Sequence, residues 1–319
     1  MSSSLCALPG EYLATVGVFD GVHRGHRVIL DALMTRARAL GVPSVLFTFR
    51  PRPVTVLAPT TPHDELTPPP RKWRLLAEAG IVRVVVLRFS RRFAQIEAED
   101  FITQVLGGGH GLRGVWIGHD FRFGRERRGD HQVLAQAGKR FGFETVRVEP
   151  VRLDGVVVSS TEIRRQVRRG EIKQAARFLG RWPDLEGIVV QGRGLGRRSL
   201  VPTANLLLPE TQCLPAPGVY VGEAEWDGLY VPAVMNLGRR PTLTKGLDLA
   251  AEVHVLDFNG DLRGKRLLFR LRRRLREERN FGSVNELRHQ IERDIDEARG
   301  LAAGWGSVDS ELVNGDDSC

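Results

Sequence analysis

Residues 12–26 read YLATVGVFDGVHRGH, and they predict a strand, a glycine-containing turn and the start of a helix. The apolar run at residues 12–18 is typical of a buried strand. Apolar side chains then recur at helical spacing, so we expect a helix over residues 25–40. A strand that leads through such a turn into a helix is the repeating unit of α/β proteins.

The first half of the chain repeats this alternation. Further strands are expected at Ser44–Phe49, Arg83–Leu87, Gly114–Ile117 and Glu144–Val148, and helices at Arg71–Ala79, near Ala98–Leu106 and near Gln132–Arg140. Residues 51–70 are rich in proline and are expected to form a loop. The pattern predicts a doubly wound parallel sheet, whose ligands bind beyond the carboxyl ends of its strands.

The pattern changes after Pro183. Short strand-like segments, separated by Gly, Pro and Asp turns, are expected at Leu185–Gln191, Val219–Glu225, Tyr230–Asn236, Ala250–Leu256 and Arg266–Leu271. Such a series predicts a small antiparallel β-barrel or sandwich. A second domain with a different architecture therefore follows the parallel sheet.

One amphipathic helix closes the second domain, from Ser283 to about Arg299, with Ser283 and Glu286 as a capping box at its start. The residues beyond it are rich in Gly, Ser and Asp. We therefore expect domains at residues 1–183 and 184–300, and a disordered tail at residues 301–319.

The composition is that of a globular protein: 319 residues, of which 42% are hydrophobic and 27% charged. No stretch approaches 18 uninterrupted apolar residues, so a transmembrane helix is not expected. Residues 1–11 lack the pattern of a signal peptide, which favours the cytoplasm. The cysteines, Cys6, Cys213 and Cys319, are too far apart for a disulfide framework or a metal-ligand spacing.

The charge is unevenly distributed. The net charge is +9, and 42 of the 47 cationic residues are arginine, which we attribute to GC-rich codon usage. Residues 1–183 carry 29 cations and 17 anions, whereas residues 184–319 carry 18 cations and 21 anions. This excess suits a domain that handles phosphates. A nucleic-acid-binding protein is an alternative, but the chain lacks a nucleic-acid recognition motif.

The loop after the first strand has the features of a phosphate site. Glycines let the backbone approach phosphate oxygens, and a helix N-terminus supplies N–H groups. Two imidazoles can donate hydrogen bonds to oxygens that gain charge in the transition state. Two surface histidines would be the structural alternative. The candidate catalytic groups are His23 and His26, and the candidate phosphate-binding residues of this loop are Gly17, Phe19, Asp20 and Gly25.

Two further segments of the first half carry candidate ligands. Ser159, Ser160 or Thr161 can simply cap the helix that follows, but Arg164, one turn later, could grip a triphosphate beside that helix N-terminus. Asp120 follows the strand that ends near Ile117, at the edge where ligands are expected. We therefore count these residues as candidate ATP or phosphate ligands.

The second half has its own candidate site. Gly192, Gly194 and Gly196 form a glycine-rich run that could bind phosphate or could be only a flexible hairpin. Thr203 and Asn205 follow, and a hydroxyl and an amide oxygen are good ligands for Mg²⁺. Glu252 lies in an otherwise apolar strand, where an unpaired buried carboxylate would be costly. Glu252 is therefore a candidate active-site residue; its neighbour His254 has no expected role.

These motifs, in this order, resemble those of the prokaryotic bifunctional riboflavin kinase/FAD synthetase family, from about Val16 to Arg299. The resemblance implies a Rossmann-like nucleotidyltransferase domain and a riboflavin kinase-like barrel. It implies that riboflavin and ATP give FMN in the barrel domain, and that FMN and ATP give FAD and pyrophosphate in the first domain. Mg²⁺ would serve both sites, and no membrane or nucleic-acid partner is implied.

The resemblance also implies residue roles. His23 and His26 would contact the ATP phosphates, helped by the serine-threonine-arginine segment and by Asp120. Thr203 and Asn205 would bind Mg²⁺ and ATP, and Glu252 would be the catalytic base. Weaker candidates for flavin binding are Phe49, Arg52, Phe123, Arg276 and Phe281.

Four positions depart from the motifs of that family: Arg50, Arg52, Leu200 and Arg263. They leave a second interpretation open, a specialised paralogue that acts on a modified flavin or retains one activity. Another adenylyltransferase with a different acceptor would explain the first half alone. The sequence leaves homo-oligomerisation open.

Overall fold

The computed structural model describes residues 8, 10–60, 64–191, 201–239 and 249–305. The chain forms two compact units, one of Met1–His63 with Pro69–Ser160 and one of Asp64–Pro68 with Thr161–Cys319. The units thus divide after Ser160, whereas the barrel strands begin at Asp184. The boundaries predicted for two functional domains, 1–183 and 184–300, stay a prediction.

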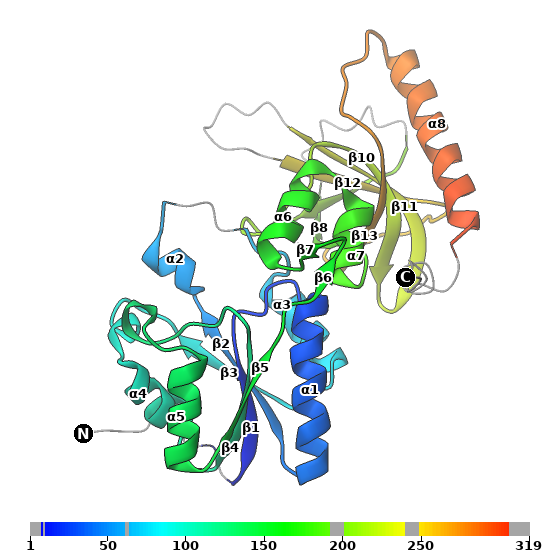
Figure 1. Cartoon of the computed structure of the whole chain (residues 1–319). Coiled ribbons are helices and arrows are strands. Elements are labelled where there is room, and N and C mark those ends of the chain that lie inside the picture. The colour runs from blue at the N-terminus through cyan, green and yellow to red at the C-terminus, as the bar shows by residue number, and fades with distance from the viewer. Residues whose placement is uncertain (1–7, 9, 61–63, 192–200, 240–248, 306–319) are drawn as a thin grey trace. The chain divides into compact units, whose positions relative to one another are not determined.

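The first unit contains a five-stranded parallel sheet in the order β3-β2-β1-β4-β5 (Figure 1). Ala14 in β1 pairs with Val45 in β2 and with Val115 in β4. The order reverses between β1 and β4, which is where such sheets bind ligands. The strands are β1 (Tyr12–Val16), β2 (Ser44–Arg50), β3 (Arg83–Arg88), β4 (Leu112–Gly118) and β5 (Glu144–Val148).

Helices cover both faces of this sheet. Successive side chains of a strand point to opposite faces, so neighbouring residues of β1 pack against different helices. Leu13 packs with apolar residues of α1 (Arg24–Leu40) and α3 (Pro69–Glu78). Tyr12 and Ala14 pack with residues of a π-helix and of α5 on the other face. The predicted doubly wound sheet is confirmed. The helices of this second face are α4 (Ala98–Asp100), the π-helix (Phe101–Val105) and α5 (His131–Phe141).

The short elements of the first unit differ from the predicted pattern. The proline-rich segment expected to be a loop contains α2 (Pro53–Leu57), where proline at the first helical position costs no hydrogen bond. The helix expected at 98–106 is divided between α4 and the π-helix. The remaining elements are 3₁₀ turns at Phe93–Gln95 and Arg125–Arg127, and the hairpin β6 (Arg152–Leu153) and β7 (Val156–Val157).

The second unit is a closed antiparallel barrel in the order β10-β11-β12-β9-β8-β13, as predicted. Two helices precede it, α6 (Ser160–Arg169) and α7 (Ile172–Leu179). β9 was not among the expected strands, because four residues are too few to show a periodicity. The barrel strands are β8 (Asp184–Val190), β9 (Ala204–Leu207), β10 (Gly218–Trp226), β11 (Leu229–Arg239), β12 (Leu249–Val255) and β13 (Arg266–Arg276).

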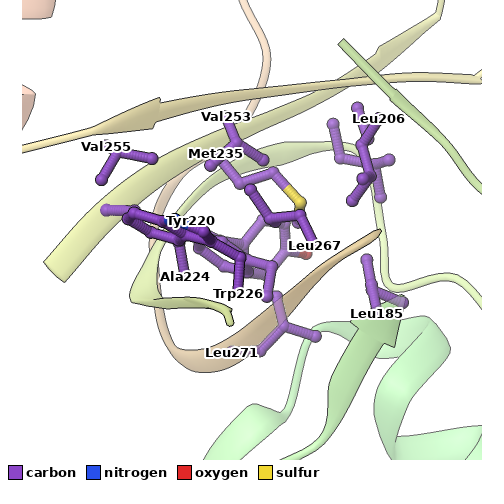
Figure 2. Packing of buried hydrophobic residues seen from close by; sticks show 14 of the residues in the cluster. Leu185, Leu206, Tyr220, Ala224, Trp226, Met235, Val253, Val255, Leu267 and Leu271 are labelled. Atoms are coloured by element: carbon purple, nitrogen blue, oxygen red, sulfur yellow. The ribbon is translucent and has the colours of Figure 1, made fainter. Parts of the chain in front are cut away.

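Large apolar side chains fill the barrel (Figure 2). Tyr220, Met235 and Leu267 meet there and are fully buried. Ile172 and Ala176 of α7 belong to the same cluster, so this helix packs on the barrel. The interior is therefore a packed core, which leaves the mouth and the outer face of the barrel for ligands.

The last helix, α8 (Val284–Ala303), packs on the outer face of the barrel through Ala298 and Ile295. Ser283 caps it as predicted, since its Oγ accepts the backbone N–H of Glu286 at 3.2 Å. The helix continues past the predicted end, so residues 301–303 of the expected tail are helical; residues 306–319 lie outside the described residues. Among the described residues, no helix is long and apolar enough to cross a membrane.

Candidate functional site

The predicted phosphate loop of the first unit leads from β1 into α1. His23 is the N-cap of α1, and its Nδ1 accepts the backbone N–H of His26 at 3.3 Å. Because Nδ1 accepts this bond, a neutral His23 carries its proton on Nε2 and can donate it to a ligand. The loop thus presents an imidazole donor at a helix N-terminus.

His23 and His26 stack on each other, with ring centroids 3.6 Å apart, and Phe19 packs against His26. Burial lowers the pKa of His26 well below its usual value, and the electrostatic influence of the neighbouring His23 and Lys72 lowers it further. The Nδ1 atom of His26 is buried and has no hydrogen-bond partner among the described residues. His26 is therefore neutral at physiological pH.

Contacts from three other segments hold this loop in place. The carbonyl of Val18 accepts hydrogen bonds from Lys72 at 3.1 Å and from Thr48 at 3.4 Å. Ser160, at the start of α6, donates to the carbonyl of Asp20 at 2.8 Å. These bonds fix the backbone between β1 and α1, as pre-organised phosphate binding requires.

Two glycines allow the ring stack to form. A Cβ on Gly17 would lie 2.9 Å from the Phe19 ring, and a Cβ on Gly25 would lie 3.3 Å from the His23 ring. Phe19 itself has a φ of 50°, an uncommon conformation for a residue with a side chain. Within this unit, the glycines thus permit close contact between side chains, in addition to their predicted role near phosphates.

Asp20 is buried, and its carboxylate lies 3.5 Å from the guanidinium of Arg52. Arg52 is one of the positions that depart from the family motif, and the structure brings it to the phosphate loop. A guanidinium here adds a fixed positive charge beside the predicted anion site.

The other predicted ligands of the first half differ in their surroundings, and of these Ser160 contacts the phosphate loop through the carbonyl of Asp20. Asp120 follows β4, and its side chain is 84% exposed. Ser159 and Ser160 lie at the start of α6. Thr161 and Arg164 belong to the second compact unit, where Arg164 donates to the carbonyl of Asp64 at 2.9 Å. Their contact with ATP stays a prediction.

The two aromatic candidates for flavin binding in the first unit, Phe49 and Phe123, belong to one cluster. Phe49 packs edge-on against Phe93, which in turn packs against Phe101. Phe123 is buried, with its ring between those of Phe101 and Phe121. Phe121 is partly exposed, so it is better placed for a ligand than the predicted Phe123.

In the barrel, strand pairing gathers three polar side chains. Glu252 of β12 pairs with Asn205 of β9 on one side and with Asn236 of β11 on the other. Directly opposed residues have Cβ atoms about 5 Å apart and point to the same face. The predicted carboxylate therefore lies between two amides, and it is partly exposed.

Glu252 and Asn236 face a cavity of about 600 Å³ beside α8. Its apolar wall includes Val219, Val234 and Ile295, and its polar wall includes Asn236 and Glu252. A cavity of this size holds a small organic molecule. Other lining residues are Thr203, His254, Arg276, Arg279, Phe281, Leu287 and Ile291.

A second cavity of about 250 Å³ lies at the barrel mouth. It is lined by Thr203, Asn205, Asp261 and Arg263 among others, so Thr203 faces both cavities. Arg263, another departure from the family motif, holds the pKa of the Asp261 carboxyl at about 2. Gly192, Gly194, Gly196 and Leu200 lie outside the described residues.

Arg276 and Phe281 line the larger cavity as predicted candidates for flavin binding. Arg276 also has a structural partner: its guanidinium binds both oxygens of the buried Asp294 on α8, at 2.8–3.1 Å. The Arg276 guanidinium also lies 5.7 Å from the Phe281 ring centroid. The ion pair between Arg276 and Asp294 connects β13 to α8 and so shapes the cavity.

Sequence reasoning missed the part that Asn236 and His254 play in the cavity wall. Asn236 could have been found because it is a polar residue within the apolar strand β11, the same feature of the sequence that identified Glu252 in its strand. His254 shares the face of Glu252, and its Nδ1 lies 2.8 Å from the carbonyl oxygen of Pro202.

The donor set at the barrel mouth fits a magnesium ion bound largely by phosphates. Thr203 and Asn205 supply a hydroxyl and an amide oxygen. Across the described parts of the chain, no group of three His, Cys, Asp or Glu side chains could hold a metal by itself. Mg²⁺ commonly binds through few protein ligands and substrate phosphates, so these residues suit it.

A glycine-containing loop lies at the switch point of the doubly wound sheet, and the barrel has a cavity with a carboxylate in its wall. These features are typical of an enzyme with one candidate site in each part of the chain. Residues 7–162 match the family model described as FAD synthetase, and residues 179–302 match the one described as riboflavin kinase. The chain belongs to the bifunctional riboflavin kinase/FMN adenylyltransferase family. It is a transferase with a kinase domain and an adenylyltransferase domain, both of which use ATP.

Several relatives share nearly the whole chain. A bifunctional riboflavin kinase/FMN adenylyltransferase from Pseudomonas fluorescens is 39% identical over 291 residues, covering 91% of this chain and 93% of the relative. The protein of the same name from Escherichia coli strain K12 is 38% identical, covering 88% and 89%. A crystal structure from Streptococcus pneumoniae, described as a macrolide-efflux protein, matches with a TM-score of 0.84 at 30% identity, covering 94% and 96%.

Proposed function

We propose that Glu252 and the larger barrel cavity carry the riboflavin kinase reaction, and that the loop around His23 and His26 carries FMN adenylylation. The pairing of Glu252 with Asn205 and Asn236 supports this division most directly. It places a carboxylate at a cavity of flavin size, beside the residues that suit an ATP-bound metal.

In the kinase site, Glu252 takes the proton of the ribityl 5′-hydroxyl as that oxygen attacks the γ-phosphorus of ATP. The bond from the γ-phosphorus to the β–γ bridging oxygen breaks, and ADP leaves. The apolar cavity wall holds the isoalloxazine ring, while Thr203 and Asn205 face the phosphates. Mg²⁺, held by these two residues and by phosphate oxygens, would supply positive charge to the transferring phosphoryl group.

In the first unit, a phosphate oxygen of FMN attacks the α-phosphorus of ATP, and pyrophosphate leaves. This displacement needs positioning and charge stabilisation but no protein nucleophile. His23 donates from Nε2 to phosphate oxygens that gain charge. Lys72 and Arg52 add positive charge close to the loop. Mg²⁺ is proposed for this reaction as well.

The paralogue interpretation has one structural observation in its favour. Arg52 lies beside Asp20, so one of the departures from the family motif changes the charge at the phosphate loop, where the acceptor would be bound. Parallel assays with FMN and with modified flavins decide between the two interpretations. Normal turnover of riboflavin and FMN would exclude the paralogue interpretation, whereas a preference for a flavin analogue would establish it.

Because both reactions consume ATP, we place the enzyme in the cytoplasm. A homo-oligomer is compatible with the proposal, and sedimentation would determine it. No nucleic acid takes part in either reaction, so retention on RNA or DNA that weakens with salt would contradict this part of the proposal.

The decisive experiment is incubation of the purified chain with riboflavin, ATP and Mg²⁺, followed by chromatographic separation of riboflavin, FMN and FAD. We expect FMN to form first and FAD to follow. In parallel, the His26→Ala variant should form FMN but no FAD. The Glu252→Ala variant should form FAD only when FMN is supplied. If either single substitution abolished both reactions in a folded protein, the two-site division would be wrong.

A further inference from the structure

His254 lies beside Thr203, which lines both barrel cavities. It shares one face of β12 with Glu252, because residues two apart in a strand point the same way. The register pairs Val253 with Ala204 of β9, so the residues just before β9 lie beside His254. His254 also lines the larger cavity.

A hydrogen bond joins the His254 ring to the chain segment before β9. Its Nδ1 lies 2.8 Å from the carbonyl oxygen of Pro202. A carbonyl oxygen only accepts, so Nδ1 is the donor and carries a proton.

This bond acts on the residue that follows Pro202. Thr203 faces both cavities, and the proposed kinase site uses its hydroxyl at the ATP-bound metal. Fixing the carbonyl of Pro202 fixes the peptide plane that enters Thr203. A side chain whose backbone is held in this way needs less ordering when the nucleotide binds.

We propose that His254 is a positioning residue for Thr203: by holding the carbonyl of Pro202, it orients the Thr203 hydroxyl toward the ATP phosphates. The inference rests on the proposed kinase function of the barrel. It assigns His254 no contact with the flavin and no proton transfer. Its loss should therefore weaken ATP use more than riboflavin use.

Three substitutions at His254 separate this role from a general packing role. The amide nitrogen of Asn can occupy the place of Nδ1, whereas that of Gln reaches the place of Nε2. His254→Ala and His254→Gln should raise the KM for ATP about fivefold, the effect of losing one neutral hydrogen bond, with the KM for riboflavin changed less than twofold. His254→Asn should restore the KM for ATP to within twofold of the original value. His289→Gln, an exposed histidine on α8, is the matched control and should change neither constant.

A double-mutant cycle with Thr203→Val tests whether His254 acts through Thr203. Thr203→Val alone should raise the KM for ATP, and adding His254→Ala should then change it no further. Additive effects, or a rise in the KM for riboflavin instead, would overturn the positioning role. If Thr203→Val had no effect on ATP use, the proposed function of Thr203 would fail, whatever His254 does. If the alanine variant did not fold, the comparison of Asn with Gln would decide the question.

Discussion

The two candidate sites hold their polar groups in different ways. In the first unit, His23 and His26 stack where the loop enters α1, and Asp20 of the same loop pairs with Arg52. In the barrel, Asn205, Asn236 and Glu252 lie on three neighbouring strands, and Asn236 and Glu252 face the larger cavity. The first arrangement is held by hydrogen bonds and lies beside Lys72 and Arg52, which suits phosphate positioning. The second presents a carboxylate to a bound molecule, which suits removal of a proton.

The largest effect is expected from a substitution that disables the barrel site alone. Glu252→Gln keeps the shape of the side chain but removes the base, so the kcat of FMN formation should fall by about 10²–10⁴. Initial rates with saturating riboflavin measure this loss. FAD formation from supplied FMN is the internal control and should persist. A kcat within tenfold of the original would show that Glu252 is not the base.

The next largest effect is expected from a substitution that disables the phosphate loop of the first unit alone. His23→Asn retains a good N-cap for α1 but removes the Nε2 donor, so helix stability should change little. FAD formation from FMN should fall by about 10²–10³, as for the loss of one donor to a developing charge. Rates of pyrophosphate release measure it. Unchanged release by a folded variant would assign the phosphate contact to another group.

A smaller effect tests how the barrel cavity is held. Asp294→Asn weakens the bond between α8 and Arg276 and should lower the free energy of unfolding of the protein by about 2–3 kcal/mol. Asp296→Asn is the matched control on the same helix, because its pair with Arg299 is exposed. Urea unfolding compares them. Equal changes in the free energy of unfolding for the two substitutions would contradict the stabilising role of the buried pair.

The smallest effect concerns pH. The pKa of His26 is lowered in the folded chain, whereas the unfolded chain binds the proton at the ordinary value near 6.5. The unfolded state therefore binds more protons below about pH 6.5, and stability falls as the pH drops. His26→Gln should lose less stability than the original protein between pH 7 and pH 5. Urea unfolding at both pH values measures the difference; parallel losses would contradict the neutral state of His26.

Much of the fold followed from local patterns. The strands β1 to β5 and the barrel strands other than β9 were predicted, because their apolar residues recur with clear periods. The hydrogen bond from Ser160 to the carbonyl of Asp20 was not predictable, since 140 residues separate the partners. The π-helix and the short α2 were missed because such elements have no distinct periodicity.

What the sequence determined by itself was the two-part architecture and the chemistry available: imidazoles after a strand, and a hydroxyl, an amide and a carboxylate in the second half. Those follow from residue types and short-range spacing. Only the tertiary structure decided that Arg52 meets Asp20, that Asn236 and His254 join Glu252, and that Asp294 holds Arg276. Such contacts depend on strand register and helix packing, in which residues distant in sequence are brought together by burial of apolar surface.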